Sequence, residues 1–514
     1  MHRLPTLIAA IAAGSLSIAA DAAPGDLDTT YGLSGKSFAS VNGADASYAN
    51  AVAIQPDGKI VVAGKCFVLA TGSTQICALR LLPNGFFDTS FGNNGSKLVN
   101  VGGTGVTEVA HAIALQSDGK IVLAGSCGPE TAPTETCLVR LLADGSLDGG
   151  FGLSGKSRIS FGAVGMAAGI QEARAIAVLA DGKLLLGGRC RGDTLATVGV
   201  CVVRLNSNGS LDTAYANSGR TIAVNALDER LTSMLVRADG RVLIATEGNN
   251  SLPPAAAIKK VYVSQLTVSG AWDITFGNLA TTGTQVLELC TQNKLPRMAL
   301  QPDGKVIVAF VCNNGGDIQA GKRLDITGQI DPAYNYPGGT PFGVPVESGE
   351  YGLKPVLQAD GRTVFAASSY NVAPNPVTLD FLTWRAGDTG TLDATYTGGG
   401  LKPMQAASDR ANDAALQTDG KLVLAGTCDN GASFQICTAR LQGDASSAAR
   451  NCSMDIDGDG RVLPTTDALI LARASLGLSG AAVLNGIATT GPRNTWPLIR
   501  DFLVNQCGMS NLAP

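Results

Sequence analysis

The sequence predicts an all-β protein, a seven-bladed β-propeller closed by its N-terminal strand, with a small α-helical domain at the C-terminus. Three observations lead to this fold class: one turn sequence recurs seven times, each copy lies between two apolar runs, and the two ends of the repeated region complement each other. Gly accounts for 64 of the 514 residues and charged residues for only 16%. Such a composition fits a turn-rich chain of strands.

The repeated turn is an Asp-Gly pair between two apolar runs, as in Gln55–Gly64. Asp-Gly in this setting is a strong signal for a β-hairpin with a two-residue type I′ turn. Successive pairs are 57 to 64 residues apart, and a period of this length, built from strands, indicates a repeat architecture. The seven pairs begin at Asp57, Asp118, Asp181, Asp239, Asp303, Asp360 and Asp419.

Each repeat contains four expected strands, which in the first repeat are Ala49–Gln55, Ile60–Cys66, Cys77–Leu82 and Lys97–Val101. In most repeats the first strand has alanine four places before the Asp. Small side chains suit the crowded place where blades converge, so we expect this strand to be innermost. A Leu-Asp-x-x-aromatic element recurs between the third and fourth strands.

The ends of the repeated region complement each other. Residues Asp26–Gly32 form the last quarter of a repeat, and the seventh repeat stops at Leu441 without that quarter. The N-terminal strand can therefore complete the last blade, and the closed propeller leaves only short, protected edges. An open β-solenoid, which would not need complementary ends, is the alternative.

On the seven turns and their spacing, residues 24–445 resemble the delta-60 repeat, a propeller-forming family of bacterial exported proteins. The match is strong for repeats one, two, three and seven. In repeats four to six, Arg replaces Lys or the glycine after the second strand is lost, as at Ala245-Thr246 and Ala366-Ala367. The resemblance implies a fold and an envelope or extracellular setting, and no activity, because a fold alone does not give one.

The N-terminus, residues 1–22, has the features of a secretory signal peptide. A basic start is followed by the apolar run Leu4–Ala20 and by Ala20-Asp21-Ala22, an A-x-A-like site that predicts cleavage near Ala22 or Ala23. A membrane anchor is the alternative, but the run is shorter than the ~20 apolar residues that a span needs. No later stretch is long and apolar enough to span. We expect a secreted or periplasmic protein without a membrane span.

The chain has 12 cysteines, and in an exported protein an even number favours disulfides over a metal site. In four repeats one cysteine ends the second strand and another opens the third, so neighbouring antiparallel strands bring them within bonding distance. A zinc site is disfavoured because no C-x-x-C pair occurs and histidine is nearly absent. The expected pairs are Cys66 with Cys77, Cys127 with Cys137, Cys190 with Cys201 and Cys428 with Cys437, and by elimination Cys290 with Cys312 and Cys452 with Cys507.

A polar linker, residues 446–451, leads to a second domain at 452–514, which begins with an EF-hand-type calcium loop. Calcium needs six to eight oxygen ligands, and acids at positions 1, 3 and 5 with a carbonyl at position 7 supply several. Position 12, normally Glu, is Thr466 here, and the acid comes one residue later. An Asx-rich turn without metal is the alternative. The expected ligands are Asp455, Asp457, Asp459, the carbonyl of Arg461, Thr466 and Asp467.

Two helices are expected after this loop, at Asp467–Leu476 and Trp496–Val504, because their apolar residues recur at helical spacing. Loop and helix followed by a second helical segment resemble a dockerin-type module. Residues Ala481–Arg500 contain no carboxylate, so we expect one calcium site rather than the two of that family. The predicted Cys452–Cys507 pair would take the place of the second calcium as a cross-link.

The expected function is that of an exported, non-enzymatic scaffold or binding protein for an extracellular or envelope protein or glycan. A net charge of -4 and the lack of basic runs exclude nucleic acid. The alternative is a polysaccharide hydrolase, which would need two facing carboxylates in the channel. A variable ring of residues lies seven places before each Asp and could line a channel mouth; the simpler interpretation is a row of partly exposed strand residues. The ring consists of Asn50, His111, Arg174, Thr232, Pro296, Leu353 and Asn412.

Overall fold

The structure is a computed structural model of the whole chain. It describes residues 23–103, 105–129, 134–161, 171–191, 198–223, 227–249, 258–279, 283–313, 317–334, 336, 353–371, 378–405, 408–444, 456–457, 464–475, 478–489 and 493–505. The predicted signal peptide (1–22) and linker (446–451) lie outside these residues.

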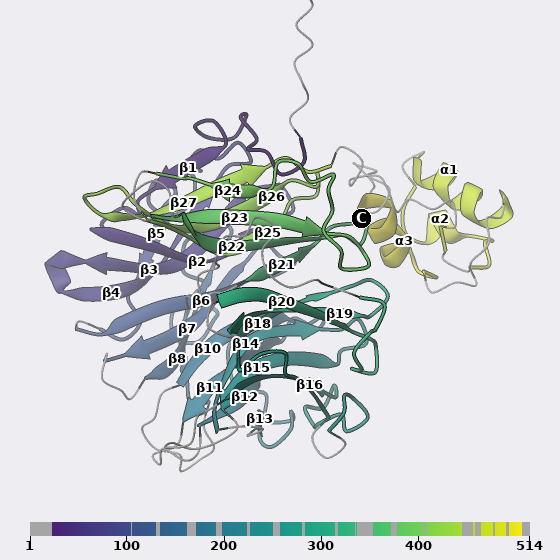
Figure 1. Ribbon diagram of the computed structural model, residues 1–514, viewed down its shortest axis with the longest axis horizontal. Helices are drawn as coiled ribbons and strands as arrows, with labels where there is room; N and C mark the ends of the chain where they lie inside the picture. Colours follow the sequence, from purple (N-terminus) through teal and green to yellow (C-terminus); the bar gives the residue numbers. More distant parts are fainter. Residues whose placement is uncertain are drawn as a thin grey trace, which may run out of the picture.

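Strands dominate the described part of the repeated region, and they follow one another in groups that match the repeats (Figure 1). We call these groups units 1 to 7. The units are β2 (Ala46–Ile54), β3 (Ile60–Val68), β4 (Ser73–Leu81) and β5 (Ser96–Val99); β6 (Thr107–Leu115), β7 (Ile121–Gly128), β8 (Glu135–Leu141) and β9 (Lys156–Ile159); β10 (Gln171–Val178), β11 (Leu184–Arg191), β12 (Val198–Leu205) and β13 (Arg220–Ala223); β14 (Leu227–Val236), β15 (Val242–Asn249), β16 (Lys259–Leu266) and β17 (Thr284–Leu287); β18 (Gln292–Leu300), β19 (Val306–Asn313) and β20 (Asp317–Leu324); β21 (Lys354–Leu357), β22 (Thr363–Asn371), β23 (Thr378–Ala386) and β24 (Gly400–Lys402); and β25 (Asp409–Leu416), β26 (Leu422–Asp429) and β27 (Phe434–Leu441) with β1 (Lys36–Ala39).

Within each unit, consecutive strands pair antiparallel, as the hairpin signals predict. The short strand β1, near the N-terminus, pairs with β27 from Lys36↔Ala439 to Ala39↔Ile436 and so becomes the outer strand of the last unit. Single parallel bridges join units 1 and 2 and units 4 and 5. In unit 5 the described residues contribute three strands.

The first strand of every unit is an edge strand of its unit, which agrees with the expected innermost position. Each first strand contacts the first strand of the next unit, from β2 through β6, β10, β14, β18 and β21 to β25, and β25 in turn contacts β2. Figure 1 shows the colours running round the molecule from purple to green, with β27 returning beside β1.

The hydrophobic core lies between neighbouring units rather than inside one of them. One cluster joins Ile60 and Leu79 of unit 1 to Val423 and Ile436 of unit 7, all fully buried. Similar clusters fill the spaces between the other described units. Because each sheet has an apolar face on both sides, a single unit cannot bury its own core, as is usual for repeat proteins.

A cluster of three side chains, which we call the arginine clamp, recurs on these sheets. An arginine near the end of the third strand donates to an aspartate at 2.7 to 2.9 Å, and its guanidinium lies 4.5 to 5.1 Å from an aromatic ring. Most of these arginines also donate to a turn carbonyl of the next unit. The described clamps are Arg80, Asp88 and Phe91; Arg140, Asp148 and Phe151; Arg204, Asp212 and Tyr215; Arg323, Asp331 and Tyr334; Arg385, Asp393 and Tyr396; and Arg440, Asp28 and Tyr31.

The clamp of unit 7 takes its aspartate and its aromatic ring from the N-terminal segment. Fully buried Asp28 accepts from Arg440 and from Lys421, each at 2.8 Å. Burial by itself raises the pKa of Asp28, but hydrogen bonds from Lys421 and Thr30 and the charge of Arg440 hold it far below its usual value. The carboxylate is therefore ionised at neutral pH.

At the C-terminus, a π-helical turn (Pro464–Ala468) leads into α1 (Leu469–Ser475), followed by α2 (Ala481–Leu484) and α3 (Trp496–Asn505). Their apolar residues form one small core with Ile456. Two helices were expected; the first starts two residues later than predicted because the chain before it is wound as the π turn, and α2 was missed because its single turn is too short to show a periodicity.

Candidate functional site

The first strands of the units differ in residue type at one position, seven places before the turn aspartate. In six of the described units the first strand has a β-bulge, an extra residue without a partner on the second strand. The bulge falls at or beside the variable position recognised in the sequence, and it includes Asn50, His111, Arg174, Thr232, Pro296 and Asn412. Bulges redirect side chains and are frequent beside functional sites.

A glycine faces the bulge in four units, where the two strands approach closely. A Cβ atom added at Gly64 would lie 1.9 Å from the carbonyl oxygen of Tyr48, and one at Gly125 would lie 1.8 Å from that of Val109. Gly188 and Gly426 meet the same obstacle. This explains the glycine that the well-matched repeats share, which lies within the second strand rather than after it.

Neutral side chains at the bulge join one first strand to the next. The amide of Asn50 donates to the carbonyl of Ala110 at 2.8 Å, and that of Asn412 donates to the carbonyl of Ala49 at 2.6 Å. The Thr232 hydroxyl donates to the carbonyl of Pro296 in the same way. One uncharged donor is thus sufficient to connect neighbouring strands at this position.

His111 and Arg174 hold the same position on adjacent strands and bring different chemistry. Burial lowers the pKa of His111 well below its ordinary value, and nearby positive charges lower it further. His111 is therefore neutral at pH 7. The charges belong to Arg174, Arg230, Lys65 and Arg297, which come from four different units.

The buried acids of the first strands have a structural role. Three of them, Glu108, Glu229 and Asp409, occupy one position, ten places before the turn aspartate of their unit, and the fourth, Glu172, lies one place later and pairs with Arg174. Glu108 accepts from the N–H groups of Val101 and Gly102, and Asp409 accepts from Gln405 at 2.7 Å. Glu229 instead accepts from the Thr246 hydroxyl at 2.6 Å.

Ser47, Gln171 and Asn293 make the same kind of hydrogen bond in three other units, so an acid is not required at this position. Burial raises the pKa of Glu108, and burial together with the charge of Asp380 raises that of Asp409 to about 6. Desolvation at these anchoring positions is the largest cause of both shifts.

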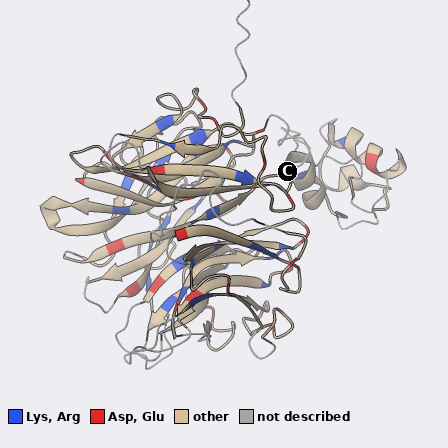
Figure 2. Ribbon diagram, viewed as in Figure 1, with Lys and Arg blue, Asp and Glu red and all other residues tan. Residues whose placement is uncertain are grey.

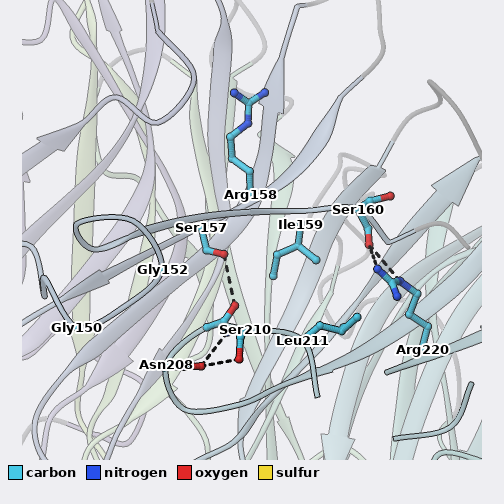
Figure 3. A pocket seen from close by; sticks show the side chains of 11 residues that line it. Gly150, Gly152, Ser157, Arg158, Ile159, Ser160, Asn208, Ser210, Leu211 and Arg220 are labelled. Carbon is cyan, nitrogen blue, oxygen red and sulfur yellow. Dashed lines mark hydrogen bonds between the residues drawn. The ribbon is translucent and has the colours of Figure 1, made fainter. Parts of the chain in front are cut away.

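A hollow of about 510 Å³ lies between units 2 and 3, away from the first strands (Figure 3). On one side are Ser157 and Ser160, and on the other are Asn208, Ser210 and Arg220. Arg220 donates to the carbonyl of Ser160 at 3.2 Å, and Asn208 accepts from Ser210. The first contact joins the two units and the second lies within unit 3, and the charged residues that line the hollow, Arg158 and Arg220, are not buried.

Five of the predicted cysteine pairs lie at bonding distance, with Cα atoms 5.6 to 5.9 Å apart. Four of them join the second and third strands of their unit, as the sequence led us to expect. The predicted partners Cys452 and Cys507 lie outside the described residues. The described pairs are Cys66 with Cys77, Cys127 with Cys137, Cys190 with Cys201, Cys290 with Cys312 and Cys428 with Cys437.

The predicted calcium loop is described in part. Asp457 and Asp467 are both 1% exposed, and one Asp467 oxygen accepts from the N–H groups of Ile456 and Asp457 at 2.5 and 3.2 Å. Thr466 is buried on the π turn beside Asp467. The described residues contain no group of three potential metal ligands, and Asp455, Asp459 and Arg461 lie outside them.

Arg493, which the sequence did not single out, secures this loop. Its side chain donates to the carbonyl of Ile456 at 2.8 Å, its backbone N–H donates to that of Asp457 at 2.9 Å, and its guanidinium lies over the ring of Phe502 on α3. The loop and α3 are therefore connected through one residue.

Comparison with known proteins identifies the architecture. A family described as a β-propeller domain of unknown function, DUF5122, matches residues 55–91, 116–151 and 179–215. The fold is a β-propeller. Each matched segment runs from the Asp-Gly turn to the aromatic residue of the clamp. No curated protein matches the sequence.

Solved structures resemble the propeller only distantly. A protein of unknown function from Dyadobacter fermentans has 14% identity and a TM-score of 0.39, with 65% of this chain and 93% of that chain covered. The β-propeller domain of the Trilobed protease from Pyrococcus furiosus has 11% identity and a TM-score of 0.38, with 78% of this chain and 96% of that chain covered. The α-L-arabinanase of Penicillium chrysogenum, complexed with arabinobiose, has 12% identity and a TM-score of 0.41, with 67% of this chain and 98% of that chain covered. These values carry no argument about what this propeller binds. In the described part of the chain, no helix has the length and apolarity to cross a membrane.

Proposed function

We propose that this propeller is an exported, non-enzymatic binding protein whose partner is an extracellular or envelope protein or a glycan. The observation that carries this proposal is that three buried first-strand acids hold the fold together: Glu108 and Asp409 accept hydrogen bonds from the chain that enters their strands, and Glu229 accepts one from Thr246 on the neighbouring strand. A polysaccharide hydrolase would need two facing carboxylates for proton transfer and attack. The variable side chains at the bulges instead include no carboxylate, and all but Pro296 are polar groups that suit binding.

We further propose that the seven units are the blades of a closed, delta-60-type propeller. Two features support closure: β1 pairs with β27, and β25 contacts β2. Arg440 also donates to the carbonyl of Pro83 in unit 1, as Arg80 does to that of Ala143 in unit 2. The last unit thus contacts the first unit in the same way as unit 1 contacts unit 2. The predicted boundaries, with a signal peptide at 1–22, the propeller at 24–445 and a second domain at 452–514, belong to the same proposal.

The C-terminal domain is proposed to be a dockerin-like module with one calcium ion. Asp455, Asp457, Asp459, the carbonyl of Arg461, Thr466 and Asp467 would hold it, and the ion would neutralise the charge of the acids. The burial of two acids in this loop, Asp457 and Asp467, supports the assignment, since a hard cation prefers carboxylate oxygens; the backbone N–H of Asp457 also donates to Asp467.

A pull-down tests these proposals, with the mature, oxidised protein as bait in envelope extract and culture fluid, with calcium or with chelator. We expect a specific partner to be retained. Dependence on calcium, lost in an Asp457→Asn variant, would place recognition on the C-terminal module, whereas independence would place it on the propeller. No partner, together with cleavage of a polysaccharide by the purified protein, would refute the binding role and favour the hydrolase.

A further inference from the structure

The first described residues of the chain are held between units 6 and 7. The Gly25 N–H donates to the Gln442 carbonyl at 2.8 Å, and the Gln442 N–H donates to the Asp26 carbonyl at 2.7 Å, so this segment pairs with the end of unit 7. On the other side, the Gly398 N–H of unit 6 donates to the Pro24 carbonyl at 3.0 Å. The approach is close, because a Cβ atom added at Gly398 would lie 2.1 Å from the Asp26 nitrogen.

A tight turn places the backbone nitrogen of Ala23 on a carboxylate. The Ala23 N–H donates to the side chain of Asp26 at 2.8 Å, and the Asp26 N–H donates back to the Ala23 carbonyl at 2.9 Å. Ala23 directly follows Ala20-Asp21-Ala22, the predicted cleavage sequence. The nitrogen that removal of the signal peptide would free therefore already lies at hydrogen-bond distance from an acid.

The half-buried carboxylate of Asp26 forms no ion pair with a lysine or arginine of the described residues. Burial lowers the pKa of Lys402, on β24, and the negative charge of Asp26 opposes this effect, but the Lys402 ammonium donates to the carbonyl of Gly398. Figure 2 shows blue and red segments interspersed over the ring of strands, so a local partner rather than a broad field of one sign has to balance this carboxylate.

Hydrolysis would change the charge of the Ala23 nitrogen. Within the chain, this nitrogen is a neutral amide. Hydrolysis of the bond between Ala22 and Ala23 consumes one water, leaves a carboxylate on Ala22 and gives Ala23 an amino group, which is protonated at neutral pH because its ordinary pKa is about 8. A hydrogen bond between an ammonium and a carboxylate is roughly twice as strong as a neutral one. Hydrolysis after Ala23 would instead remove the carbonyl that accepts from Asp26.

We propose that the signal peptide is removed after Ala22 and that the new α-ammonium of Ala23 binds Asp26, which fixes the N-terminal segment between units 6 and 7. This inference rests on the signal peptide proposed above, and it adds the bond that is cut and the group that receives the new terminus. A peptidase of the export route supplies the hydrolysis. Because the ion pair forms only after this step, the N-terminal segment is held less firmly in the precursor than in the mature protein.

The position of the cut is tested by the intact mass and N-terminal sequence of the protein recovered from the envelope and culture fluid of its source. We expect a chain that begins at Ala23. A chain that begins at Pro24, or at any other residue after the signal peptide, would overturn this inference and leave the exported role intact. A chain that keeps residues 1–22 would refute the signal peptide as well.

Hydrogen exchange of the mature protein tests the ion pair. One variant has a glycine inserted after Ala22, so that the Ala23 nitrogen stays an amide after cleavage, and the other is Asp26→Asn. Each should lower the protection of the Gly25 and Gln442 N–H groups about fivefold, which is the difference between a charged and a neutral hydrogen bond. The two changes together should lower the protection no further, because both remove the same ion pair.

Asp57→Asn, in an exposed turn of unit 1, is the control and should leave the protection of Gly25 and Gln442 unchanged. Mass spectrometry identifies the first residue of each variant, and thermal melting checks that each variant folds. Full protection in the variant with the inserted glycine, or losses that add in the double variant, would overturn the ion pair.

Discussion

Substitution of Asp28 by Asn tests how the chain closes on itself. Asp28 is fully buried, and one of its oxygens accepts from two cations, Arg440 and Lys421, at 2.8 Å each. Removing one partner of a buried ion pair typically costs about 3–5 kcal/mol because the remaining charge is left uncompensated. In the variant, both cations would face a neutral amide in place of the carboxylate, so we expect a loss of that size in the free energy of unfolding, measured by urea denaturation.

The matched control is Asp148→Asn, which breaks the same clamp inside the chain. Arg140 donates to Asp148 at 2.8 Å, as Arg440 does to Asp28. Both variants should lose stability, but only Asp28→Asn should remove hydrogen-exchange protection from β1 (Lys36–Ala39) before the rest of the protein unfolds. Because the native pKa of Asp28 lies below its unfolded value, its contribution is present above pH ~4 and disappears below, so the deficit of the variant should vanish in acid.

The reasoning would be refuted if Asp28→Asn cost less than about 1 kcal/mol, or if β1 kept its protection. The first outcome would mean that Arg440 and Lys421 find other partners or water. The second would mean that the backbone pairing of β1 with β27 is sufficient by itself to hold the N-terminal segment.

Three further predictions concern other sites. The pKa of Asp409 is raised to about 6, so the folded protein binds this proton more tightly than the unfolded chain does, and stability should fall as the pH rises from about 4 to 6. In urea denaturation, the Asp409→Asn variant should lack this fall and should be up to about 3 kcal/mol more stable than the parent at pH 7. An unchanged pH profile would contradict the assignment. Calcium at a hundredfold excess over its Kd should add about 2.7 kcal/mol to the protection of α1 and α3, measured by hydrogen exchange on the full chain. The Asp457→Asn variant should lose this gain, and the control Asp419→Asn, in an exposed turn, should keep it. An equal gain in both variants would argue against calcium binding at the predicted loop. Replacing Cys66 and Cys77 together by Ala should cost roughly 2–3 kcal/mol in urea denaturation, the value for a cross-link that closes a loop of about ten residues; an unchanged midpoint would show that pairing of β3 and β4 makes the cross-link redundant.

Features that depend on residues near in sequence could be predicted. An Asp-Gly pair and its two flanking strands lie within one hairpin, so Gln55–Gly64 predicts the hairpin of β2 and β3 correctly. The predicted two-residue type I′ turn is wrong: the Gly58 N–H donates to the Gln55 carbonyl, so Pro56 and Asp57 are the central residues, and Gly58 but not Asp57 has a positive φ, whereas type I′ needs a positive φ at both central residues. The cysteine pairs on the second and third strands follow from the same local pairing. The EF-hand-type loop stays a prediction, because only Asp457, Thr466 and Asp467 among its predicted ligands fall in the described part.

Contacts between units could not be predicted, because their partners are about sixty residues apart or at opposite ends of the chain. Arg80 bonds to Ala143 of the next unit, and nothing near Arg80 in the sequence shows this. A signal was nevertheless present: an arginine stands eight places before the clamp aspartate in most repeats. In unit 4 this residue is Gln265, and Arg237 takes over the contact with the next unit by donating to Gly304 at 2.5 Å. The bulges were not predicted, although each of the six includes the variable position seven places before the turn aspartate.

The clamp of unit 7 also sets the order in which the chain can fold. Asp28 and its partner Arg440 are separated by 412 residues. At synthesis rates of about 5–20 residues per second, roughly 20–80 s pass between their appearance. During that time the carboxylate stays in water, β1 has no neighbour, and the apolar face of unit 1 that later meets unit 7 is uncovered. The N-terminal segment with Asp28 and β1 is thus made early but ordered late. Until β27 and Arg440 have been synthesised, the incomplete chain must be kept from pairing with other chains.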